Sequence, residues 1–170
     1  MMLQQRKRCW PRLAAMAALA GLCAGAFGTV ALGQGAMPPP KEAIFARKVL
    51  MDSIGHNMDE LEANARSTKI DLGEGRNNAD NISVMLMTFP HLFPPSTNEW
   101  KPNVHRAPGT DTFAAPEIWT GFADFYQRAR DAADVAFKTS RAETEPAFKD
   151  LVAQLRRACD SCHAIYVKKN

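Results

Sequence analysis

The 170-residue sequence predicts an all-α fold, an antiparallel four-helix bundle. Four segments carry apolar residues three and four positions apart, the spacing that places side chains on one face of a helix. No segment after the N-terminal region shows the alternation of apolar and polar residues that is typical of a strand. One long proline-containing connection separates the second segment from the third.

The first helix is expected to begin at about Lys41, directly after a proline-rich linker, because proline is tolerated in the first turn of a helix. Arg47 occupies a position in its inward stripe where an apolar residue is expected. A glycine-containing stretch, residues 71–76, is predicted to end this helix. The rest of the stripe is apolar and consists of Ile44, Met51, Ile54, Met58, Leu61 and Ala65.

The second helix is shorter, and Pro90 is predicted to close it. Residues 91–115 contain four prolines and are predicted to form one irregular connection, although a connection of this length is unusual inside a compact domain. The apolar side of the second helix consists of Ala79, Ile82, Leu86 and Phe89.

The third helix is predicted to open at Pro116, and the fourth begins near Pro146. Lys168 and Lys169 are expected at the end of the fourth helix, where cations interact favourably with the helix dipole. The third helix has an apolar face of Ile118, Trp119, Phe122, Phe125, Ala129, Ala132 and Ala136, and the fourth has Phe148, Leu151, Val152, Leu155, Cys159, Cys162 and Tyr166.

Residues 1–33 have the layout of a secretory signal peptide: a basic start, an apolar run and small residues before a cleavage point after Gly33. The alternative is a retained membrane anchor, but residues 13–32 are rich in alanine and glycine and only weakly apolar. Cleavage leaves residues 34–170 as one domain with 17 basic and 18 acidic residues. This balance gives no indication of nucleic-acid binding.

Only two cysteines remain after cleavage, and both belong to the motif Cys159-x-x-Cys162-His163. On a helix, these three side chains share one face, so two sulfurs could bond the two vinyl groups of one haem while the histidine binds its iron. A structural zinc site would need further ligands, and His56, His91 and His105 are scattered. A redox dithiol is expected at the start of a helix rather than at its end.

The sequence resembles the cytochrome c′ family, the class II c-type cytochromes. The haem motif lies at the end of the last helix, and Arg47 precedes Met51 by four residues in the first helix. The connection after the second helix contains LFPPST, and the third helix opens Pro-Glu-Ile-Trp at residues 116–119. The resemblance covers essentially all of residues 34–170, and the position of the motif together with the opening of the third helix makes it specific.

This resemblance implies one haem c near the C-terminal end of the last helix, with thioether bonds to Cys159 and Cys162 and with His163 as the proximal iron ligand. Family members differ mainly at the residue opposite this histidine. Leucine or phenylalanine there leaves the iron five-coordinate and open to small gases, whereas methionine closes the site in electron carriers. The matching residue in this chain is Met51.

The helical rise supports Met51, because this residue and His163 are expected at similar depths of antiparallel first and last helices. Met58 would lie about 10 Å deeper. Met87, near the end of the second helix, is an alternative ligand, and Met51 could instead be an ordinary core residue. Arg47 is expected to pair with a haem propionate; the alternative is that its side chain extends to solvent.

The sequence therefore predicts a periplasmic monohaem protein that carries single electrons through a six-coordinate His/Met iron and is not an enzyme. The expected partners are redox proteins of the periplasm, with a homodimer also possible. The alternative function is binding of nitric oxide or carbon monoxide at a five-coordinate iron.

Overall fold

The computed structural model describes residues 39–107 and 111–168, and these residues form the predicted helical bundle. The predicted signal peptide and Lys169 lie outside the described residues. No described helix is both long and apolar enough to cross a membrane. The helices are α1 (Pro40–Arg66), α2 (Leu72–Thr88), α3 (Glu117–Thr120), α4 (Phe122–Thr139) and α5 (Glu145–Tyr166), with two 3₁₀ turns, η1 (Phe89–Leu92) and η2 (Pro95–Thr97).

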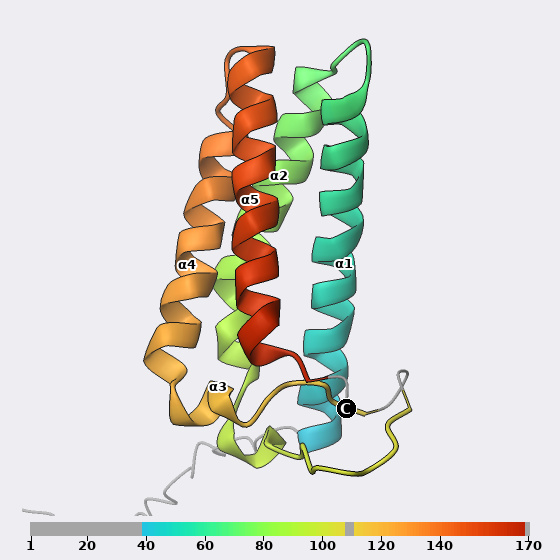
Figure 1. Cartoon of the computed structure of the whole chain (residues 1–170), viewed down its shortest axis with the longest axis vertical. Helices are drawn as coiled ribbons and strands as arrows, with labels where there is room; N and C mark the ends of the chain where they lie inside the picture. Colours follow the sequence, from blue (N-terminus) through green and yellow to red (C-terminus); the bar gives the residue numbers. More distant parts are fainter. Residues whose placement is uncertain (1–38, 108–110, 169–170) are drawn as a thin grey trace, which may run out of the picture. The chain divides into compact units, whose positions relative to one another are not determined.

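Helices α1, α2, α4 and α5 lie side by side, and successive helices run in opposite directions (Figure 1). Consequently α5 ends at the end of the bundle where α1 begins, and the connection from α2 to α3 lies at this same end (Figure 1). Helices α1 and α5 pack more loosely against each other than the other neighbouring pairs do.

The buried side chains form two clusters. The larger one fills the bundle between the four long helices and includes Met58, Leu61, Ile82, Phe148 and Leu155. The smaller, aromatic cluster lies where α5 ends and consists of Phe89, Phe93, Ile118, Phe125 and Tyr166, with Trp119 packed against it.

The break between the first two helices lies earlier than the sequence suggested. Helix α2 already begins at Leu72, and the Asp71 side chain accepts a hydrogen bond of 3.0 Å from the Glu74 amide at its start. The predicted break at residues 71–76 is therefore wrong, because this N-cap outweighs the low helix propensity of the glycines. Gly75 lies inside α2 and lets the Phe148 ring pack closely against the backbone.

Replacing Gly75 by alanine is expected to lower the free energy of unfolding by about 1–3 kcal/mol through overpacking. A Cβ at this position would lie 2.5 Å from the Phe148 ring and 2.9 Å from the Asn64 amide nitrogen. Gly55→Ala is the matched control, because a Cβ in the middle of α1 meets nothing within 4 Å. The control should gain up to about 1 kcal/mol from helix propensity. The free energy of unfolding is measured with denaturant. An equal change of this free energy in both variants would contradict the packing argument.

The predicted third helix is interrupted at Gly121, where the backbone leaves helical geometry (φ −121°, ψ 37°) and separates α3 from α4. This break turns Phe122 outward, so it is 39% exposed, whereas Phe125 is buried. Phe122 was wrongly assigned to the apolar face, since that face assumed one continuous helix. Helix α5 begins as predicted near Pro146, with the Thr144 side chain as its N-cap.

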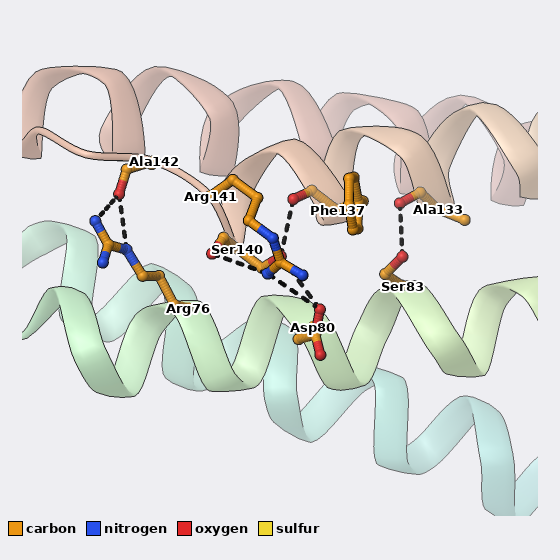
Figure 2. A network of polar contacts seen from close by, with 8 residues as sticks. All are labelled: Arg76, Asp80, Ser83, Ala133, Phe137, Ser140, Arg141 and Ala142. Carbon is orange, nitrogen blue, oxygen red and sulfur yellow. Dashed lines mark hydrogen bonds and ion pairs between the residues drawn. The ribbon is translucent and has the colours of Figure 1, made fainter. Parts of the chain in front are cut away.

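A set of polar contacts holds α2 against α4 and the turn that follows it (Figure 2). The Arg76 guanidinium donates to the Ala142 carbonyl oxygen, and the Ser83 hydroxyl donates to the Ala133 carbonyl oxygen at 3.0 Å. Arg141 lies 3.5 Å from the Asp80 carboxylate. The Arg76 and Arg141 contacts involve the first half of α2 and the turn that follows α4, toward the opposite end of the bundle from the end of α5 (Figure 1).

The connection from α2 to α3 was predicted to be irregular, and it contains the two 3₁₀ turns. Its last residues pair with the chain that follows α5 in an isolated antiparallel bridge, Ala114 with Val167. The Ala115 amide donates to the Tyr166 carbonyl oxygen at 2.9 Å, and the Lys168 amide donates to the Phe113 carbonyl oxygen at 2.8 Å. The connection is thus attached to the segment that directly follows the Cys-x-x-Cys-His motif.

Candidate haem site

The Cys-x-x-Cys-His motif lies in the last two turns of α5. Cys159 and Cys162 are free, half-buried thiols three positions apart, so their sulfurs leave neighbouring points of one helix face. His163 is exposed, yet it lines both cavities that border the motif.

The first cavity, of about 110 Å³, lies between α1, α4 and α5. The second, of about 440 Å³, lies between α1, the end of the connection and the end of α5. Apolar side chains form most of both walls, which suits a flat apolar ligand. The two cavities are adjacent and share five lining residues: Met51, Phe89, Phe125, Cys162 and His163.

Burial raises the pKa of both thiols, and the neighbouring Cys159 helps to raise the pKa of Cys162 to about 11. Both thiols are therefore protonated at neutral pH. A thioredoxin-like dithiol needs the opposite, a lowered pKa that supplies a thiolate, so this alternative is disfavoured. Within residues 39–107 and 111–168, no three His, Cys, Asp or Glu side chains come together as a metal site.

The structure separates the methionines that the sequence left as candidates. Met51 is half-buried and lines both cavities together with His163. Met58 is buried and lines only the first cavity, two turns further along α1. Met87 is 50% exposed and lines neither cavity. His56 is exposed.

Arg47 lines the second cavity and is only 4% exposed, so its side chain does not extend to solvent. Burial lowers the pKa of its guanidinium to about 10, and the Glu99 carboxylate partly offsets this effect. The group therefore stays charged at neutral pH. Among the described residues, no carboxylate lies within ion-pair distance of it.

Sequence reasoning missed a hydrogen-bonded group beside the motif. The Tyr166 hydroxyl donates to the Asp124 carboxylate at 2.6 Å, and Arg128 donates to the same oxygen at 2.7 Å. This contact ties the last turn of α5, which carries Cys162 and His163, to α4. The four-residue spacing of Asp124 and Arg128 could have indicated their ion pair, but no local pattern pointed to the distant Tyr166.

Comparison with known proteins identifies the family. The protein-family model described as Cytochrome C′ matches residues 42–166, which is most of the chain. The chain belongs to the cytochrome c′ family. No curated protein matches it.

Solved structures of cytochromes c′ share this fold. Cytochrome c′ from Thermochromatium tepidum is 22% identical, with a TM-score of 0.65 over 76% of this chain and 96% of that chain. Oxidised R. palustris cytochrome c556 is 23% identical, with a TM-score of 0.63 over 76% and 98%. The nitric oxide complex of a point variant of cytochrome c prime from Alcaligenes xylosoxidans is 18% identical, with a TM-score of 0.65 over 78% and 99%.

Membership of the cytochrome c′ family implies a covalently bound haem c in a haem protein of a generally non-enzymatic family. The residues of this chain fit that group. Two neighbouring thiols and the following imidazole border largely apolar cavities, and a buried, charged guanidinium lines the second of them. These are the groups that thioether attachment, iron ligation and a haem carboxylate require.

Proposed function

We propose that this cytochrome c′ family member carries single electrons in the periplasm. In this proposal, Cys159 and Cys162 would hold one haem c, His163 and Met51 would be the ligands of its iron, and Arg47 would pair with a haem propionate. Export through a cleaved signal peptide, residues 1–33, gives access to the redox proteins of that compartment.

The observation that carries the proposal is the shared position of Met51 and His163. Both line both cavities, as Cys162 does, although they lie on different helices. Met51 comes from α1 and His163 from α5, so the two side chains approach the same space from different walls. Met87 is a weaker candidate, because it is exposed and lines neither cavity.

When bound, haem supplies reversible one-electron iron chemistry. The protein contributes the rest. Met51 would supply a thioether ligand from α1 and His163 an imidazole ligand from α5. A thioether ligand favours reduced iron and raises the potential. The apolar lining from α1 and α4 limits the access of water to the site.

The second candidate function is binding of nitric oxide or carbon monoxide. One specific observation favours it: a matched cytochrome c prime structure from Alcaligenes xylosoxidans is a nitric oxide complex. In this chain, Met51 is only half-buried and borders a cavity, so a small gas could displace its flexible side chain.

Optical spectra decide between the two functions. The protein should be matured in a host that attaches haem c, and its mass should exceed that of the processed polypeptide by one haem. The ferrous protein is then expected to be low-spin and to bind carbon monoxide slowly. A high-spin ferrous spectrum with immediate uptake of carbon monoxide would overturn the electron-carrier proposal and favour the gas-binding one.

A further inference from the structure

Arg47 makes its hydrogen bonds with the connection between α2 and α3. One terminal nitrogen donates to the Thr97 hydroxyl at 2.8 Å. The other donates to the Thr112 hydroxyl at 2.6 Å and to the Thr97 carbonyl oxygen at 3.4 Å. Thr97 and Thr112 are 0% and 6% exposed, so these bonds are shielded from water. One side chain of α1 thus joins two points of the connection that are 15 residues apart in sequence.

The face of the same guanidinium packs on aromatic rings. Its central carbon lies 4.6 Å from the centre of the Phe93 ring and 5.7 Å from that of Trp119. The Trp119 indole in turn donates to the Phe93 carbonyl oxygen at 3.2 Å. The Thr97 hydroxyl also donates to the Pro94 carbonyl oxygen at 2.8 Å. Arg47 is therefore the centre of a buried network that holds the start of the connection against α1.

The far part of the connection forms a wall of the second cavity through Thr112, Phe113 and Ala114. It is attached on two sides. On the α1 side, Arg47 binds Thr112, and the Lys48 ammonium donates to the Asp111 carbonyl oxygen at 2.8 Å. On the α5 side, the bridge of Ala114 and Val167 joins it to the chain that follows His163.

We infer that Arg47 is a positioning residue, which fixes the connection as a wall of the haem cavity and thereby sets the exposure of the cofactor to water. This inference rests on the proposed function and adds a second role to Arg47 beyond its charge. It also gives the long connection a purpose, because Thr112, which Arg47 binds, lines the cavity.

The residue type suits this role. A guanidinium is planar, so it donates in two directions along its edges while its flat faces pack on rings. A lysine would keep the positive charge for a haem carboxylate but could not bind Thr97 and Thr112 in the same arrangement. We call the hydrogen bonds from Arg47 to Thr97 and Thr112 the clamp. Arg47→Lys therefore separates the role of the positive charge from the role of the clamp.

Thr97→Val tests the clamp without touching the cavity, since Thr97 is buried and lines neither cavity. In the haem-loaded protein, Thr97→Val and Arg47→Lys are each expected to raise hydrogen exchange of the Asn98 and Ala114 amides about tenfold, the effect of losing one or two buried hydrogen bonds. Exchange in the middle of α4 should stay unchanged. Both variants should also lower the reduction potential, because water stabilises the more positively charged ferric site.

Thr88→Val is the matched control, because among the described residues the Thr88 hydroxyl bonds only to the Val84 carbonyl oxygen within α2. It should change neither the exchange of the connection nor the potential. Unchanged exchange in Thr97→Val and Arg47→Lys would overturn the clamp, and faster exchange with an unchanged potential would overturn its effect on the haem. The proposed function fails separately, if the unmodified protein lacks covalent haem or is high-spin.

Discussion

Replacing Met51 by leucine is expected to convert the low-spin spectrum of the haem protein to a high-spin one. Leucine has a similar volume but no sulfur, so the iron would lose its distal ligand while the cavity wall keeps its shape. Carbon monoxide should then bind rapidly to the ferrous protein, and the reduction potential should fall because the thioether no longer favours reduced iron. Absorption and electron paramagnetic resonance spectra measure the change, with stopped-flow mixing for carbon monoxide.

Two other methionines of this chain provide the controls. Met87→Leu changes an exposed residue outside both cavities, and Met58→Leu changes a buried residue of the first cavity alone. Both variants should remain low-spin. If Met51→Leu stays low-spin and Met87→Leu becomes high-spin instead, the distal ligand comes from α2. This result would remove the main support for the proposed ligand set.

Replacing both Cys159 and Cys162 by alanine is expected to abolish covalent haem, even though His163 is retained. A haem stain should disappear from the denatured protein, and the mass should equal that of the processed polypeptide. The apparent melting temperature should fall well below that of the unmodified protein, because a covalently held cofactor stabilises only the folded state. Mass spectrometry and thermal unfolding measure the two effects.

Single replacements and a neighbouring residue sharpen this test. Cys159→Ala and Cys162→Ala should each lose one of the two thioether bonds. Ser161→Ala, between the two cysteines, removes only a hydroxyl that is exposed and bonded to the Ala158 carbonyl oxygen, so it should keep full haem content. Haem that survives denaturation of the double variant would mean that the attachment lies elsewhere in the chain.

The helices were readable from the sequence because the spacing of apolar residues is a local signal. Most of the predicted inward stripe of α1 is buried, including its one charged member, Arg47, whereas Met51 and Ala65 are half-buried. Helix ends were less predictable. Asp71 caps α2 ahead of two glycines, and Gly121 breaks a continuous apolar pattern, because capping and backbone geometry compete with propensity at single residues.

The sequence also identified the candidate site, since Cys159, Cys162 and His163 lie within five residues of one helix and need no folding to be recognised. It could rank Met51 above Met87 only through the family resemblance. The structure adds a physical reason, the exposure of Met87 and the place of Met51 on both cavity walls. Side chains on different helices come together through packing, and a local sequence pattern does not predict such contacts.

By itself, the sequence determined that this chain forms four amphipathic helices and carries a haem-attachment motif at the end of the last one. Only the tertiary structure decided which residues of α1 and of the connection meet that motif. Arg47 shows why: its position in the stripe indicated burial, but its partners Thr97 and Thr112 lie 50 and 65 residues away. A buried charge must be satisfied by whatever groups the folded chain brings to it, and those groups are set by how the connection packs across the bundle end.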